Sequence, residues 1–163
     1  MHYLRRMALS TLVFATAMPI AATGRLTAGL LLSGLACWWF LPVLQLLTGL
    51  LMIRGAGVGR TAALSRYFET YRPWSLWLLV MAATVILLPN PGAATYPLAL
   101  TAIVPAVMTI RGLLRFSRND LGDSPRRAWQ RVALHQAATY IVLIVYMDLS
   151  VALWPRVVGV LGR

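Results

Sequence analysis

Long uncharged stretches, separated by short arginine-rich segments, dominate this sequence. The first three cover residues 7–23, 26–53 and 73–110, with lengths of 17, 28 and 38 residues. A helix needs about 20 apolar residues, in a range of roughly 17 to 25, to cross the hydrocarbon core of a bilayer. The third stretch is too long for one crossing, and the Pro-Asn-Pro-Gly sequence at 89–92 is a turn signal that divides it into a hairpin.

These lengths predict an all-α integral membrane protein, a bundle of about five transmembrane helices with short loops. The composition agrees, because 60% of the 163 residues are apolar and only 12% are charged, whereas about a quarter are charged in a soluble domain. The whole chain, 1–163, is expected to form a single domain. The five spans are expected at residues 7–23, 26–53, 73–88, 94–114 and 132–154.

The segments that flank the predicted spans are alternately rich and poor in arginine along the chain. All 15 cations are arginines, and 12 of them lie before the first span or in the loops 54–72 and 111–131. An excess of arginine marks the loops that stay in the cytoplasm. The pattern therefore predicts a bacterial cytoplasmic (inner) membrane, with the N-terminus inside and the C-terminus outside.

The first segment has a second interpretation. A basic stretch at 1–6 followed by an apolar stretch at 7–20 has the layout of a secretory signal. A cleavage site needs a pair of small residues, and Ile20 occupies one of those positions. We therefore expect the segment to be retained.

Small residues recur every four positions in the second stretch, at Gly29, Ser33 and Cys37. This spacing forms a stripe on one helix face and permits close helix packing. Cys37 is the only cysteine, which excludes an intramolecular disulfide and a cysteine-based metal framework.

Four arginines of the inside loops are candidate binding residues: Arg60, Arg66, Arg126 and Arg127. A net charge of +11 suggests nucleic acid in a soluble protein, but these arginines flank apolar segments, so no nucleic-acid partner is expected. Cations near an anionic leaflet gain about 1 kcal/mol each. We therefore expect the four to bind anionic lipid or an acidic partner.

The first inside loop contains an amphipathic segment at 61–71. Leu64, Tyr67, Phe68 and Tyr71 share one face at the spacing i, i+3, i+4 and i+7. The segment is either a helix lying on an anionic leaflet or a connector whose aromatic side chains cover neighbouring helices.

In the second inside loop, residues 119–123 are expected to form a turn. Ser124 and Pro125 then begin a helix that continues into the last span.

Two ionisable side chains, His135 and Asp148, lie at the predicted membrane depth. They are 13 residues apart, about 20 Å along a helix, so they cannot share a proton or a metal. His135 is a candidate haem ligand, with the second axial ligand supplied by a partner. The alternative is a histidine satisfied at the membrane interface.

The order of features between residues 35 and 150 forms a further pattern. A tryptophan-bearing span at 38–53 precedes a glycine-containing loop, and Arg-Thr-Ala-Ala-Leu-Ser-Arg-Tyr-Phe-Glu-Thr-Tyr-Arg-Pro at 60–73 leads into the hairpin. Arg-Gly-Leu-Leu-Arg at 111–115 and Arg-Arg-Ala-Trp at 126–129 follow. This order resembles the Yip1-domain membrane family. The resemblance implies a five-span protein that binds partners or shapes membranes without catalysis.

No catalytic constellation accompanies these features, because the sequence has no HExxH, no GxSxG and no aspartate cluster for magnesium. We expect a non-enzymatic, multi-pass membrane protein without a cofactor, which binds other membrane proteins, itself or lipids in a scaffolding or membrane-organising role. One alternative is an accessory subunit of a respiratory or photosynthetic complex, contacting haem, quinone or pigment through His135 or the tryptophans. Another is a small transporter subunit that uses Asp148.

Overall fold

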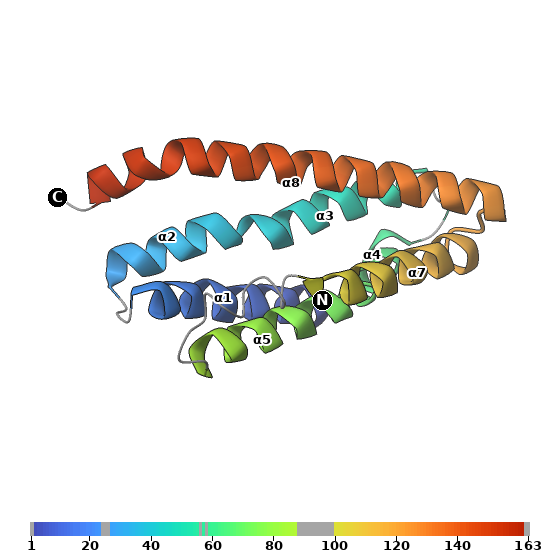
Figure 1. Ribbon diagram of the computed structural model, residues 1–163. Coiled ribbons are helices and arrows are strands. Elements are labelled where there is room, and N and C mark those ends of the chain that lie inside the picture. The colour runs from blue at the N-terminus through green and yellow to red at the C-terminus, as the bar shows by residue number, and fades with distance from the viewer. Residues whose placement is uncertain (1, 24–26, 56, 58, 88–99, 162–163) are drawn as a thin grey trace.

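The computed structural model describes residues 2–23, 27–55, 57, 59–87 and 100–161, and these are mostly helical. Figure 1 shows an elongated bundle in which most helices follow one long axis, with α8 lying along α2 and α3. The helices are α1 (His2–Thr23), α2 (Ala28–Trp38), α3 (Phe40–Met52), α4 (Arg60–Glu69), α5 (Arg72–Leu87), α7 (Ile103–Asn119) and α8 (Pro125–Leu161).

Helices α2 and α3 together form the predicted second span. Thr27 caps α2, because its Oγ1 accepts a hydrogen bond from the Leu30 amide at 3.2 Å. Trp39 joins the two helices and keeps α-helical dihedral angles. Pro42 lies in the first turn of α3, where a missing amide hydrogen costs little.

The prediction of about five spans is wrong. In the part of the chain that the structure describes, one segment is long and apolar enough to cross a membrane, Ala28–Met52, with 25 residues. Only 29% of its most apolar portion is buried, whereas the core helix of a soluble protein is mostly buried. A membrane location is therefore compatible with the fold through this segment.

The other predicted spans differ from the second in the length and charge of their described helices. Helix α5 is described over 16 residues, up to Leu87, and these cover about 24 Å of the roughly 30 Å core. Helix α1 carries Arg5 and Arg6 near its start, and the 17 uncharged residues that follow are at the lower limit for a crossing. Helix α7 begins at Ile103 and includes three arginines, and residues 94–99 of its predicted span lie outside the described residues. Helix α8 begins with three arginines that precede its predicted span, and many side chains of the second half of the helix lie outside the described residues.

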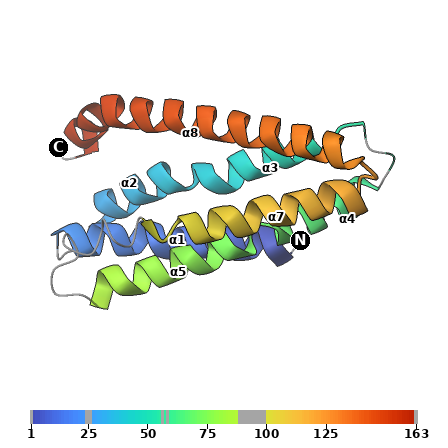
Figure 2. The same ribbon diagram turned by 45° about the vertical axis from the view of Figure 1, so that its right-hand side comes forward.

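Two groups of buried side chains hold the described helices together. One lies between α1 and α5, which run side by side in both views (Figures 1 and 2). The other lies where α3, α4, α7 and α8 meet. The first group consists of Met7, Phe14, Ala17, Leu78, Met81 and Ala82. The second consists of Met52, Ile53, Ala63, Tyr67, Phe68, Tyr71, Leu113, Phe116 and Val132.

Two local predictions about the loops can be compared with this arrangement. Tyr67, Phe68 and Tyr71 are buried in the second group, so the aromatic face of 61–71 covers neighbouring helices. Helix α8 begins at Pro125, and the amide of Ala128 donates to the carbonyl oxygen of Ser124 at 2.9 Å. Of the two interpretations of 61–71, the contacts favour the connector that covers neighbouring helices, and α8 begins at the predicted residue.

Candidate functional site

A buried hydrogen-bond network is centred on the hydroxyl of Tyr67. Tyr67 Oη lies 2.8 Å from His135 Nε2 and 3.0 Å from Thr48 Oγ1. It donates to Tyr71 Oη at 3.1 Å. The network thereby joins α3, α4 and α8 at side chains that are all buried.

A glycine on α3 makes room for this tyrosine. A Cβ at Gly49 would lie 2.5 Å from Cε1 of Tyr67, closer than such atoms approach in proteins. The adjacent Thr48 donates to the carbonyl oxygen of Leu44 at 2.8 Å, which fixes its hydroxyl beside the ring. Thr48 and Gly49 therefore allow α4 to dock closely on α3.

The hydroxyl of Tyr67 and the ring of His135 form a hydrogen bond at 2.8 Å, and the tautomer of His135 determines which of the two donates. Burial lowers the pKa of His135 to about 4 and raises the pKa of Tyr67 to about 12. The network is therefore neutral at pH 7. Nδ1 of His135 is buried and has no hydrogen-bond partner among the described residues.

The surroundings of His135 do not fit a haem. Its Nε2 is engaged by Tyr67, and the adjacent cavity is about 240 Å³, below the roughly 300–1,000 Å³ of small-molecule sites. Within the described residues, no group of three or more His, Cys, Asp or Glu side chains could hold a metal ion. Side chains around this cavity are Thr48, Leu51, Met52, Arg131, Leu134, His135 and Ala138.

Next to this cavity, Arg131 ties three helix ends together. Its Nε lies 2.9 Å from Oδ2 of Asp123, and its Nη1 donates to the carbonyl oxygen of Met52 at 2.7 Å. Ser117 near the end of α7 donates to the same carboxylate oxygen at 2.7 Å. Sequence reasoning did not identify this role, since these residues lie in separate segments of the chain.

The four arginines predicted to bind lipid or a partner are exposed. Arg66 forms an ion pair with Asp120, so its charge is partly used within the molecule. Arg60 begins α4, and Arg126 and Arg127 lie in the first turn of α8. Figure 1 shows α4 and the start of α8 at the same end of the bundle.

The predicted packing stripe is not continuous. Ser33 is buried, but no heavy atom lies within 4 Å of a Cβ built at Gly29. The side chain of Cys37 lies outside the description. Asp148 is exposed on α8. Close contact between α8 and the α2–α3 pair instead involves Tyr146, whose ring stacks on Phe40 at 3.9 Å.

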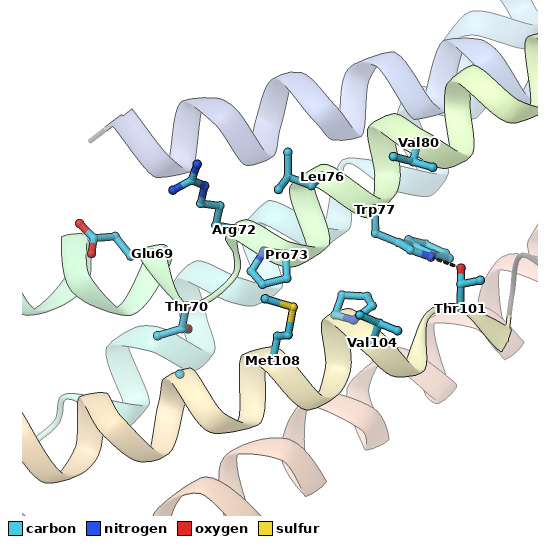
Figure 3. Close-up of a pocket in the computed structure, with 12 residues that line it drawn as sticks. Glu69, Thr70, Arg72, Pro73, Leu76, Trp77, Val80, Thr101, Val104 and Met108 are labelled. Carbon is cyan, nitrogen blue, oxygen red and sulfur yellow. Dashed lines mark hydrogen bonds between the residues drawn. The ribbon is translucent and has the colours of Figure 1, made fainter.

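A groove of about 750 Å³ lies between α5 and α7 (Figure 3). Trp77 projects from α5 toward α7, and its Nε1 donates to Thr101 Oγ1 at 2.9 Å. Sequence reasoning missed the groove because it depends on the register of two antiparallel helices. Its lining is largely apolar and consists of Glu69, Thr70, Arg72, Pro73, Leu76, Trp77, Val80, Thr101, Val104, Pro105, Met108 and Gly112.

The groove continues into a polar depression at the end of α4. Glu69, Thr70 and Gly112 line both hollows, and the depression has a volume of about 290 Å³. Its other lining residues are Arg66, Arg115, Phe116, Asn119 and Asp120. The two together form one continuous surface with an apolar body and a charged mouth.

These observations define a helical bundle protein with one candidate membrane-spanning segment among its described residues. Comparison with protein-family models, curated proteins and solved structures finds no match for this chain. The resemblance to Yip1-domain proteins therefore stays a prediction.

Proposed function

We propose that this chain is a non-enzymatic, helical membrane protein that binds lipids. The observation that carries the proposal is the exposure of Ala28–Met52, an apolar segment of membrane-spanning length. Leu32, Leu47 and Leu51 are each more than half exposed along it. Such a face is stable when lipid tails surround it, since water disfavours extended apolar surface.

Other helices extend this apolar exterior. Ile141 and Leu149 of α8 and Val80 of α5 are also more than half exposed. Monomeric soluble proteins rarely expose contiguous apolar patches larger than a few hundred Å². The same surface offers contacts to other membrane proteins or to a second copy of the chain.

The arginine distribution supports a finer location. The positive-inside rule favours the arginine-rich end of the bundle on the cytoplasmic side of a bacterial cytoplasmic membrane. Helix α1 begins toward that end, and α8 finishes at the opposite end (Figure 1). We therefore place the N-terminus inside and the C-terminus outside.

The experiment measures how much protein stays with membranes after an alkaline carbonate wash. Val43 lies toward the middle of the candidate span, on its exposed side. An arginine near the centre of a membrane helix costs about 2.5–3.5 kcal/mol. We expect Val43→Arg to lower the membrane fraction, whereas Leu51→Arg, at the end of the segment, should be tolerated because its side chain can reach the interface.

The wild-type protein provides the decisive control, since it does not depend on how the variants fold. It should remain in the pellet after the wash and require detergent for extraction. Release into the wash, or purification as a folded monomer without detergent, would overturn the proposal. The cofactor-binding and transporter alternatives gain no support from the described geometry around His135 and Asp148.

A further inference from the structure

We infer that the groove between α5 and α7 seats an acyl chain of one anionic phospholipid, with the phosphate at the charged mouth. This inference rests on the proposed function and assigns a specific site to it. The groove, its mouth and the tryptophan at its far end each contribute one part of the argument.

The body of the groove fits a hydrocarbon chain. Leu76 and Val80 face it from α5, and Val104 and Met108 face it from α7; all four are about half exposed. The stretch from Pro73 to Val80 covers about 10 Å at 1.5 Å per residue, against about 15 Å for one leaflet of a 30 Å core. The groove would thus cover most of the length that an acyl chain occupies within one leaflet.

The mouth of the groove carries the charge that selects a headgroup. Arg66, Arg72 and Arg115 line the mouth and its adjoining depression, together with Glu69 and Asp120. Three positive and two negative charges leave a net charge of +1. Arg66 pairs with Asp120, whereas Arg72 and Arg115 form no ion pair within the described part of the chain. Arginine is well suited to phosphate because its guanidinium offers several donors in a planar fork.

The two ends of the groove match the two ends of a lipid. The mouth lies near Glu69 and Thr70, and Trp77 lies farther along α5 (Figure 3). The arginines therefore sit at the end where α4 meets α5, and the apolar lining leads away from them. A free phosphate would leave the apolar lining unused, so the phospholipid is the occupant that satisfies both parts.

Trp77 allows the inference to be tested in the full-length protein. We would reconstitute it in phosphatidylcholine vesicles and add phosphatidylglycerol or phosphatidylcholine with brominated acyl chains, which quench tryptophan fluorescence on contact. The difference between wild type and Trp77→Phe isolates Trp77 from the other five tryptophans. We expect half-quenching at about a fivefold lower mole fraction of the brominated phosphatidylglycerol, the ratio that one exposed cation provides near anionic headgroups.

Matched variants locate the site. The double variant Arg72→Gln/Arg115→Gln should lose the preference for phosphatidylglycerol, whereas Arg118→Gln, an exposed arginine outside the lining, should keep it. Val104→Phe, which fills the groove, should reduce quenching at least twofold. Val107→Phe, an exposed position outside the lining of the groove, should not. Inorganic phosphate at equal concentration should not displace the lipid.

Fluorescence quenching of Trp39 distinguishes failure of this inference from failure of the proposed function. It is half exposed at the junction of α2 and α3, so both brominated lipids should quench it equally if the segment lies in the bilayer. Equal quenching of Trp77 by the two lipids, or unchanged quenching in Val104→Phe, would overturn the groove assignment while Trp39 stays quenched. Absence of quenching at both tryptophans would overturn the proposed function as well. Displacement of the lipid by inorganic phosphate would overturn the inference, because it would show that the site binds a free anion and not a phospholipid.

Discussion

At the scale of single residues, His135 links stability to pH. Burial lowers its pKa to about 4 from the ordinary 6.5. Between these values the unfolded chain binds a proton that the folded protein does not, so stability rises with pH. The contribution of His135 to the free energy of unfolding is fully present above about pH 6.5. As the pH falls toward 4, this contribution decreases by up to about 1.4 kcal/mol per pH unit.

The measurement is thermal unfolding in detergent, followed by circular dichroism between pH 4 and 7. His135→Gln cannot be protonated in this range, so it should show a flatter dependence of the melting temperature on pH than wild type. The carboxylates titrate in both proteins and cancel in the comparison. Parallel curves for the two proteins would show that His135 is not a buried neutral imidazole.

The sequence could identify some of these residues but not their partners. Helical spacing placed Tyr67 and Tyr71 on one face, and membrane-depth arguments selected His135. The hydrogen bond between Tyr67 and His135 joins residues 68 apart, and no local pattern encodes such a contact. The proximity of Thr48 to Tyr67 depends in turn on how α4 docks against α3.

At the scale of elements, the docking of α4 on α3 depends on Gly49. An alanine there would place its Cβ 2.5 Å from the Tyr67 ring, and overpacking of this kind costs about 1–3 kcal/mol. Gly29→Ala is the matched control, because its Cβ would meet nothing within 4 Å. Alanine is the better helix former, so the control should be neutral or more stable by up to about 1 kcal/mol.

This prediction is tested by the melting temperatures of the two alanine variants, measured in the same detergent. Gly49→Ala should melt well below wild type and Gly29→Ala at or slightly above it. A Gly49→Ala variant as stable as Gly29→Ala would mean that the tyrosine ring does not lie against this face of α3.

Element boundaries explain why the helical class could be predicted and the number of spans could not. Runs of uncharged residues located α2, α3 and α5 closely, and Pro125 located the start of α8. The predicted span at 73–88 has 16 residues, as does the described helix Arg72–Leu87, so its length alone falls short of a crossing. Helix α7 instead continues through three arginines to Asn119. The groove between these helices depends on their relative register, which run lengths do not contain.

At the scale of the whole molecule, charge and apolar surface are segregated. Arginines of α4 and the start of α8 lie at one end of the bundle (Figure 1), and exposed leucine, isoleucine and valine side chains line its length. An apolar flank without charge would not orient the protein, and charge without the flank would not hold it in lipid. The combination suits a protein whose charged end meets anionic headgroups.

The arginines at this end should make the protein sensitive to anionic lipid. Arg60, Arg126 and Arg127 are exposed and form no ion pair within the described chain, so each can gain about 1 kcal/mol beside an anionic surface. Adding phosphatidylglycerol to the detergent-solubilised protein should raise its melting temperature more than phosphatidylcholine does, and the difference should shrink as salt screens the charges. The triple Arg→Gln variant should lose most of this difference, while the triple Arg→Lys variant, which keeps the charge, should retain it. An unchanged lipid response in the Arg→Gln variant at low salt would limit these arginines to a role in membrane insertion.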